Sequence, residues 1–130
     1  MRLLLDTHIF VWAATGSPRL PERAAELLVD QRNSRTLSVA STWEMAIKAT
    51  RSRWPEAAAM LDDIDTAATD LDTSILPIDL AATIAAGRLD WDHRDPFDRM
   101  IAAQASLGGY ALVTIDGAFA SAGIELALMS

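Results

Sequence analysis

Four acidic residues occupy similar places in the expected fold, each at the end of a strand or in the first turns of a helix. They are Asp6, Glu44, Asp98 and Asp116. In a parallel sheet the carboxyl ends of the strands meet at one edge, so these carboxylates are expected to converge although they lie far apart in the sequence. Converged carboxylates without basic partners repel one another, and they either take up protons or bind a cation. Oxygen ligands in a chain without cysteine suit Mg²⁺ or Mn²⁺.

Two of these acids also have purely structural explanations. Asp6 can cap the helix that is expected to follow the first strand. Glu44 lies three residues after Ser41, which is the spacing of a capping box, and one helical turn before Lys48, with which it can form an ion pair. Each explanation is sufficient for one residue taken alone, whereas four acids at one edge of one sheet favour a shared chemical role.

The segment HRDPFDR, residues 93–99, is the most highly charged short stretch of the chain. Asp95 can cap a helix that begins at Pro96, and Asp98 then lies in the first turn, where the helix dipole favours a carboxylate. Asp98 faces nearly the same way as Asp95, so both can reach a metal. The other charged or titratable side chains of the segment are His93, Arg94 and Arg99. The arginines either contact phosphate or neutralise the acids, and the histidine is a candidate metal ligand or proton shuttle.

Hydroxyl groups and basic side chains accompany the acids. Thr7 and Thr114 stand beside Asp6 and Asp116, where their hydroxyl groups can hydrogen-bond a carboxylate. Asp116 also precedes a glycine, a pair that is common in turns. The basic side chains near the end of one expected helix are Lys48, Arg51 and Arg53. They are candidate RNA contacts, although the helix dipole alone also favours cations there.

Aromatic side chains offer a second kind of nucleic-acid contact, because they can stack on bases. The four tryptophans are Trp12, Trp43, Trp54 and Trp91. Helical spacing instead favours a place in the core for Trp12 and Trp43. His8 stands in the first helical turn near Asp6 and is a candidate for a supporting role beside that carboxylate.

Strands and helices are expected to alternate along the chain, which predicts a mainly parallel sheet with helices on both faces. The strands are expected at residues 3–5, 36–40, 74–78, 111–114 and 124–127. The helices are expected at residues 7–14, 21–31, 41–51, from 55 onward, 80–87 and 96–107, with a helical turn at 118–120. Pro77 ends the third strand or places it at a sheet edge, Asp79 caps the next helix, and the acidic residues 62–72 are expected on a solvated face or loop.

The overall composition limits the class of protein. With 130 residues the chain is expected to form one domain, residues 1–130, and 51% hydrophobic with 22% charged residues is typical of a soluble globular protein. The apolar runs are too short for a membrane span, and the first residues do not resemble a signal peptide, so a cytoplasmic location is expected. The net charge of −7 argues against a protein that coats nucleic acid, but it is compatible with acids that converge on cations.

Four blocks of sequence together resemble the PIN-domain family, and more narrowly the VapC toxins of type II toxin–antitoxin pairs. The blocks are LLLDTHIFVW, STWEMAIK, HRDPFDRMIAAQA and ALVTIDGAF, in this order. The resemblance covers essentially the whole chain and implies a three-layer α/β/α sandwich with a mainly parallel central sheet. By motif, the catalytic and metal-binding acids of the family fall on Asp6, Glu44, Asp98 and Asp116. Asp95 matches an additional acid of the subgroup, and Thr114 matches the hydroxyl position of the last motif.

The same resemblance implies an activity and partners. The activity is that of a Mg²⁺- or Mn²⁺-dependent endoribonuclease that cuts transfer, ribosomal or messenger RNA and leaves 5′-phosphate and 3′-hydroxyl ends. The partners are a second copy, in a homodimer, and a cognate antitoxin, in a heterotetramer or larger complex. The antitoxin would lay an amphipathic segment between helices and put a basic side chain near the acids. The apolar faces of residues 21–31 and 56–68 are candidate walls of that groove.

Three other functions compete with this interpretation. A catalytically silent PIN-like module that only binds RNA or protein would have the same fold and would not require a metal. A phosphatase with Asp6 as nucleophile would need a second acid at the position of His8. A receiver domain would need a lysine after a late strand, whereas Lys48 is the only lysine in the chain.

Overall fold

The fold is built on a parallel four-stranded sheet with the strand order β3-β2-β1-β4. The computed structural model describes residues 1–51 and 53–129. The strands are β1 (Arg2–Leu5), β2 (Ser34–Ser38), β3 (Thr73–Leu76) and β4 (Ala111–Val113). Leu4 of β1 lies opposite Thr36 on one side and Leu112 on the other. The two central strands are therefore β2 and β1, and the acid at the end of β1 lies in the middle of the sheet edge.

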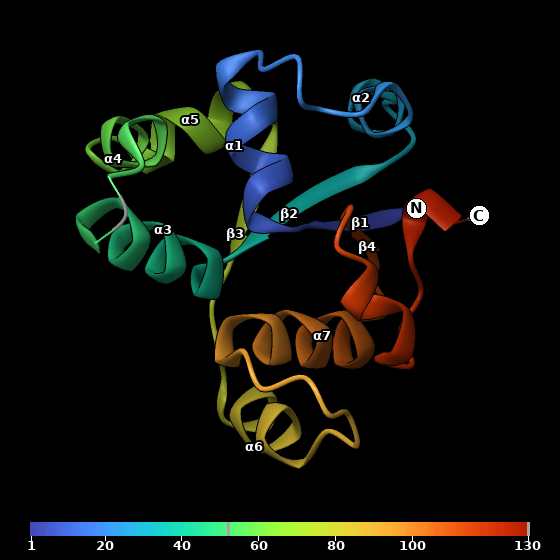
Figure 1. The fold of residues 1–130 in the computed structure, drawn as a ribbon. Coiled ribbons are helices and arrows are strands. Elements are labelled where there is room, and N and C mark those ends of the chain that lie inside the picture. Colours follow the sequence, from blue (N-terminus) through green and yellow to red (C-terminus); the bar gives the residue numbers. More distant parts are fainter. Residues whose placement is uncertain (52, 130) are drawn as a thin grey trace.

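Helices cover both faces of this sheet, which confirms the expected α/β/α sandwich (Figure 1). The helices are α1 (Thr7–Thr15), α2 (Glu22–Val29), α3 (Val39–Arg51), α4 (Pro55–Leu61), α5 (Ile64–Asp70), α6 (Leu80–Arg88) and α7 (Pro96–Gly108). Two 3₁₀ turns, η1 (Gly117–Ser121) and η2 (Ala127–Met129), follow β4. In Figure 1, α1, α2 and α5 lie on one side of the sheet and α6 and α7 on the other. None of the described helices is long and apolar enough to cross a membrane.

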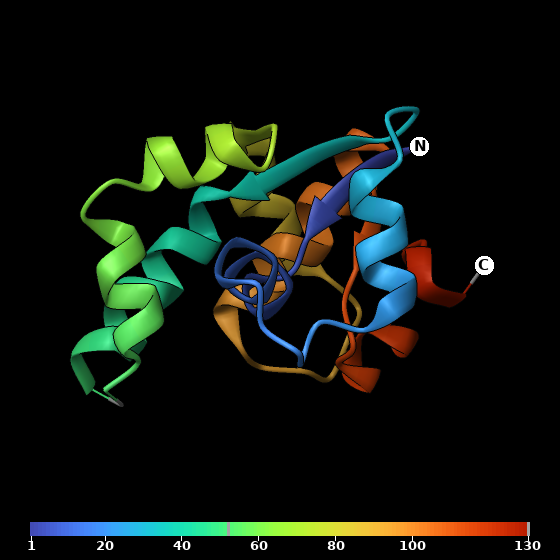
Figure 2. The ribbon, with the colours of Figure 1, turned by 90° about the horizontal axis from the view of Figure 1, so that it is seen from above.

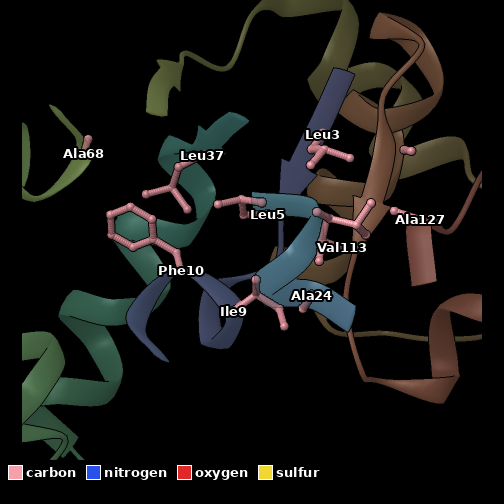
Figure 3. Close-up of a cluster of buried hydrophobic side chains, with 11 residues drawn as sticks. Leu3, Leu5, Ile9, Phe10, Ala24, Leu37, Ala68, Val113 and Ala127 are labelled. Atoms are coloured by element: carbon pink, nitrogen blue, oxygen red, sulfur yellow. The ribbon is translucent and has the colours of Figure 1, made fainter. Parts of the chain in front are cut away.

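The apolar run of β1 is buried on both faces because successive side chains of a strand point in opposite directions. Leu3 and Leu5 pack with Phe10 of α1 in one cluster, which Figure 3 shows. Leu4 faces the other way and packs with Ile101 of α7. All five side chains are at most 1% exposed. Burial of such a side chain contributes roughly 1.5–3 kcal/mol, so the strand that carries Asp6 is firmly held.

Several sequence signals fall where they were expected. β3 is an edge strand of the sheet, and Pro77 follows its last residue. Asp79 caps α6 by accepting a hydrogen bond of 2.8 Å from the Ala82 N–H. α1 ends at Gly16, whose φ of 64° lies in the left-handed region that glycine adopts without strain.

The junction between β2 and α3 differs from the prediction. The strand ends at Ser38 and the helix begins at Val39, two residues earlier than expected. Ser38 satisfies the start of the helix, because its hydroxyl accepts a hydrogen bond of 3.0 Å from the Ala40 N–H. Ser41 therefore lies inside the helix, is fully buried, and does not serve as the cap of a box with Glu44.

Three other expectations are wrong. The helix expected from residue 55 is two helices, because Asp63 accepts from the Thr66 N–H at 3.3 Å and starts α5 within the segment expected as a loop or solvated face. The strand expected at 124–127 is reduced to an isolated bridge between Leu126 and Leu112, followed by η2. Trp43, expected in the core, is 59% exposed and makes an edge contact with Phe97, while Trp12 is half-buried.

Candidate active site

The four predicted acids line one hollow of about 410 Å³ at the carboxyl edge of the sheet. Asp6 joins β1 to α1, Glu44 lies in α3, and Asp98 lies in the first turn of α7. Asp116 joins β4 to η1. The other titratable side chains of the lining are His8, Lys48, His93 and Asp95. The topology thus brings together side chains from four parts of the chain.

Asp6 both caps α1 and presents its carboxylate to the hollow. Its Oδ1 accepts a hydrogen bond of 2.8 Å from the Thr7 N–H, and its Oδ2 accepts one of 2.7 Å from the Thr114 hydroxyl. Burial raises the pKa of Asp6, the bonds from Thr114 and Thr7 oppose that shift, and the nearby Glu44 carboxylate adds to it. Asp6 can therefore cap α1 and face the acidic hollow at the same time, so its structural role does not exclude a chemical one.

Glu44 is the most deeply buried of the four acids, with 4% of the residue exposed. Its Oε1 accepts a hydrogen bond of 2.6 Å from the Thr7 hydroxyl, and its Oε2 lies 2.5 Å from Lys48 Nζ. Thr7 Oγ1 also lies 2.9 Å from Ser41 Oγ. The contacts of Thr7 hold the start of α1 against α3. Of the two structural roles expected for Glu44, a capping box or an ion pair with Lys48, the structure contains the ion pair.

Ser41 also belongs to this network, although its position in the sequence indicated a different role. It was expected to cap α3, but its hydroxyl group faces Thr7 inside the protein. Residues three apart lie on one face of a helix. If α3 is taken to begin at Val39, Ser41 and Glu44 are three residues apart within the helix and lie on the same face. That face meets Thr7 of α1, so the spacing itself was the signal.

Asp98 is paired with His93 and sits among other carboxylates. Its Oδ2 lies 2.7 Å from His93 Nε2, and only 8% of the residue is exposed. Burial raises the pKa of Asp98 to about 6, the hydrogen bond with His93 opposes the shift, and the charges of Asp95, Asp6 and Glu44 add to it. The negative charges of the neighbouring carboxylates therefore add to the rise in the pKa of Asp98.

Asp95 has the capping role that the sequence predicted. Its Oδ1 accepts hydrogen bonds from the N–H groups of Phe97, at 2.9 Å, and Asp98, at 3.1 Å, and Pro96 follows it as the first helical residue. It also lines the acidic hollow. Asp95 thus orients the first turn of α7, which carries Asp98.

The Thr114 hydroxyl forms hydrogen bonds with both Asp6 and Asp116. It donates to Asp6 and accepts a hydrogen bond of 3.0 Å from the Asp116 N–H. Asp116 itself is exposed and caps η1 by accepting from the Ala118 N–H at 2.9 Å. Asp116 therefore starts a turn, as expected from the glycine that follows it, and its exposed carboxylate lines the hollow.

The predicted RNA-binding residues have different surroundings. Arg99 donates four hydrogen bonds to backbone carbonyl groups of residues 86, 89, 91 and 93, so its guanidinium ties the loop before α7 to that helix. Arg94 and Arg51 are exposed, the latter in the last turn of α3. Lys48 lies inside the hollow and carries the positive charge nearest to Glu44. Arg99 is thus committed to the protein's own loop.

The donor chemistry of the hollow fits a hard divalent cation. Carboxylate oxygens are the ligands that Mg²⁺ and Mn²⁺ prefer. Burial, with a further contribution from the charges of Asp95, Asp6 and Glu44, raises the pKa of Asp98 to about 6, and a bound cation would offset the cost of keeping this carboxylate charged. Among residues 1–51 and 53–129, no group of three His, Asp or Glu side chains is already arranged to hold a metal. Asp6 and Glu44 each accept a hydrogen bond at both carboxylate oxygens, and all four acids line the hollow.

Comparison with known proteins gives one family and a group of similar structures. The PIN domain family matches residues 3–125. A comparison with curated protein sequences finds no match.

Three of the similar solved structures belong to VapC toxins. VapBC2 from Rickettsia felis, bound to a DNA fragment from its promoter, has a TM-score of 0.69 at 20% identity and covers 97% of this chain and 96% of that chain. DNA-bound VapBC from Salmonella typhimurium has a TM-score of 0.68 at 21% identity and covers 97% and 96%. VapC20 from Mycobacterium tuberculosis, described as a toxin that cleaves the sarcin-ricin loop, has a TM-score of 0.65 at 18% identity and covers 94% and 95%. At these identities the likeness shows a shared fold.

Proposed function

We propose that this chain, which belongs to the PIN-domain family, is a Mg²⁺- or Mn²⁺-dependent endoribonuclease that acts as the toxin of a toxin–antitoxin pair. The observation that carries the proposal is the convergence of Asp6, Glu44, Asp98 and Asp116 on one hollow. The burial of Asp98 and the negative charges of Asp95, Asp6 and Glu44 around it favour the binding of a divalent cation over the free carboxylates. The products are expected to carry 5′-phosphate and 3′-hydroxyl ends.

The protein's own residues have separate tasks in this proposal. Asp6, Asp98 and Asp116 hold the cation, with Glu44 at the inner wall of the hollow. Mg²⁺ or Mn²⁺, when bound, supplies Lewis-acid chemistry that stabilises charge on the scissile phosphate and activates water. Thr114 orients Asp6 through its hydrogen bond of 2.7 Å, and His93 orients Asp98.

Lys48 and Thr7 have the corresponding task for Glu44. Each of them bonds one carboxylate oxygen, so the side chain keeps one orientation when the hollow is filled. Rigid supporting bonds of this kind hold the groups around a metal in a productive arrangement. Asp95 contributes indirectly, because it fixes the first turn of the helix that carries Asp98.

An antitoxin partner is supported by the similar structures, several of which are VapBC or FitAB complexes. The apolar faces of α2 and of α4–α5 remain the proposed walls of the antitoxin groove. A hollow of about 310 Å³ between α2 and the end of α5 lies along part of these walls and is lined by Leu28 and Leu71. A homodimer that assembles with the antitoxin into a heterotetramer or larger complex, located in the cytoplasm, completes the proposal.

The competing function is a PIN-like module that binds RNA or protein without cleaving it. It is favoured by the absence, among the described residues, of three His, Asp or Glu side chains already arranged around a metal position. The two functions differ in one property, because only the nuclease requires a divalent cation.

The deciding experiment is cleavage of total cellular RNA by the purified protein free of antitoxin. The reaction is run with Mg²⁺, with Mn²⁺ and with a chelator, beside the variant Asp6→Asn, and the cut ends are mapped by sequencing. Discrete, metal-dependent cuts with 5′-phosphate ends that are lost in a folded Asp6→Asn variant support the nuclease. A folded wild-type protein that cuts under none of these conditions supports the binding module instead.

A further inference from the structure

A second, larger hollow of about 700 Å³ adjoins the acidic hollow, and the two share His8, Trp12 and Lys48 in their linings. We call it the side groove and define it by His8, Trp12, Arg19, Lys48, Arg53 and Trp54. These residues come from α1, the loop after it, α3 and the segment just before α4. Figures 1 and 2 both show α4 lying against α3, which brings this segment close to α1.

The side groove contains a ready-made aromatic stack. The ring of His8 is stacked on that of Trp54, with centroids 4.8 Å apart and planes 26° apart, and Trp12 lies 5.6 Å away on a tilted plane. His8 is exposed, whereas the two indole rings are half-buried. A base of an unpaired nucleotide can extend such a stack, and every base can do so because each has a flat π-face.

The same groove concentrates positive charge on an acidic protein. Three of the 11 lysines and arginines line it, although the chain has a net charge of −7. Lys48 forms an ion pair with Glu44, but within the described part of the chain neither Arg19 nor Arg53 forms one. Both arginines are exposed, and Glu56 is the acid found with them in the lining. Arginine presents a fork of N–H donors that matches the oxygens of a phosphate.

We infer that the side groove binds the unpaired nucleotides next to the scissile phosphate, with a base stacked on the His8–Trp54 pair and backbone phosphates on Arg19 and Arg53. This inference rests on the proposed function, because the nuclease proposal is what places the scissile phosphate in the acidic hollow. Aromatic faces interleaved with cations are the combination that single-stranded nucleic acid uses. A protein segment would need a more aliphatic lining, whereas Val11 is buried in the core and the exposed apolar side chains of this lining besides the indole rings are Pro18 and Pro55.

The inference also sets the kind of RNA. Bases inside a duplex are stacked on their neighbours and cannot reach a protein ring, so recognition by stacking selects single strands, loops and ends. We therefore expect the protein to prefer a single-stranded oligonucleotide, or a hairpin loop, over a blunt duplex of the same length.

The test measures RNA binding without cleavage. Fluorescence anisotropy of a labelled single-stranded RNA is recorded with protein carrying Asp6→Asn, in Mg²⁺ and again in chelator, over a range of salt concentrations. His8→Ala is expected to weaken binding about 5- to 100-fold, and His8→Phe to restore most of it, because the ring face returns. Arg19→Gln and Arg53→Gln are each expected to lower the slope of log affinity against log salt by about 0.7.

Matched controls lie outside the groove. Trp43→Leu removes an aromatic ring that is 59% exposed on α3, and Arg88→Gln removes an exposed cation at the end of α6. Both are expected to leave the RNA affinity and its salt slope unchanged. Circular dichroism and thermal unfolding of each variant verify that the fold is retained.

The outcomes separate this inference from the proposed nuclease. If the groove variants bind RNA as tightly as the controls, or if a blunt duplex binds as well as the single strand, the inference is overturned even when the wild type cleaves RNA. Groove variants that keep RNA affinity but lose a protein partner would assign the groove to that partner and equally overturn it. Weakened RNA binding by the groove variants of a protein that never cleaves would uphold the inference and reject the nuclease.

Discussion

The Thr114 hydroxyl donates a hydrogen bond of 2.7 Å to Asp6 Oδ2 and so joins the carboxyl ends of β4 and β1, which are neighbours in the sheet. Thr114 is 7% exposed, and the same hydroxyl accepts from the Asp116 N–H. One side chain thereby holds two of the four acids in place. The hydrogen bond also favours the charged form of Asp6 and so opposes the rise in its pKa that burial causes.

The first prediction follows from this bond. Thr114→Val keeps the shape of the side chain but removes the donor, so the pKa of Asp6 is expected to rise further and cleavage at neutral pH to fall about 10- to 100-fold. The acidic limb of the pH–rate profile is expected to move to higher pH. Thr83→Val, which removes an exposed hydroxyl bonded to Leu80 O in α6, is the matched control. An unchanged profile in Thr114→Val would show that Thr114 does not support the site.

The second prediction concerns the stability of the protein without metal. The pKa of Asp98 is raised from 3.8 to about 6 in the folded state, so the folded protein binds the proton more tightly than the unfolded chain. The charged carboxylate therefore costs stability, a cost that is absent below about pH 4 and fully present above about pH 6. Asp98→Asn is expected to raise the free energy of unfolding by on the order of 1–3 kcal/mol at pH 7 and by nothing at pH 4.

Urea unfolding at the two pH values, in chelator, measures this difference. Asp92→Asn, in the exposed loop before α7, provides the control and is expected to change stability by less than about 0.5 kcal/mol. The same Asp98→Asn variant is expected to lose RNA cleavage. A variant that is both less stable at pH 7 and inactive would indicate a structural role for Asp98 instead.

The third prediction separates a structural arginine from an RNA contact. Arg99 was predicted to contact RNA, but three of its bonds to carbonyl groups hold the loop of residues 89–95 and the fourth reaches Ala86 of α6. Arg99→Ala is expected to lower the free energy of unfolding by about 2–4 kcal/mol, because four partly buried carbonyl groups lose a charged donor. Arg94→Ala, in the same loop but exposed, is expected to change it by less than about 0.5 kcal/mol. Denaturant unfolding of both variants, with hydrogen exchange of the loop, measures the effect.

The sequence predicted the parts of the fold that depend on local signals. Leu3–Leu5 forms a buried central strand because a continuous apolar run suits a strand covered on both faces. Asp79 and Asp95 cap the helices that they precede because a short carboxylate reaches free N–H groups from that position. The convergence of the acids follows from the same reasoning, since parallel strands put their ends at one edge.

The errors arise where tertiary contacts outweigh local preference. Ser41 lies three residues before Glu44, as the first residue of a capping box would. In the structure the Ser38 hydroxyl caps the start of α3 instead, and the Ser41 hydroxyl contacts Thr7. Trp43 lies at a helical spacing typical of the core, but α7 covers it only in part, through the edge contact with Phe97, and the residue is 59% exposed. The stack of His8 on Trp54 joins residues far apart in sequence, so no local signal could have predicted it.

The last prediction concerns the coupling between protons and metal. Because burial and neighbouring charges raise the pKa of Asp98 to about 6 and raise that of Asp6, a cation that binds both carboxylates competes with protons. Mg²⁺ or Mn²⁺ is expected to bind more weakly as pH falls from 7 to 5 and to release protons when it binds near pH 6. Titration calorimetry in two buffers of different ionisation enthalpy measures the number of protons released.

The variant Asp6→Asn tests whether this coupling belongs to the acidic hollow. It is expected to bind the metal at least about 10-fold more weakly and to release fewer protons, because one titrating ligand is gone. The exposed-loop variant Asp92→Asn is expected to behave as the wild type in both respects. Metal binding that is independent of pH, or equally tight in Asp6→Asn, would place the cation away from these carboxylates and remove the physical basis for metal-dependent cleavage at this edge of the sheet.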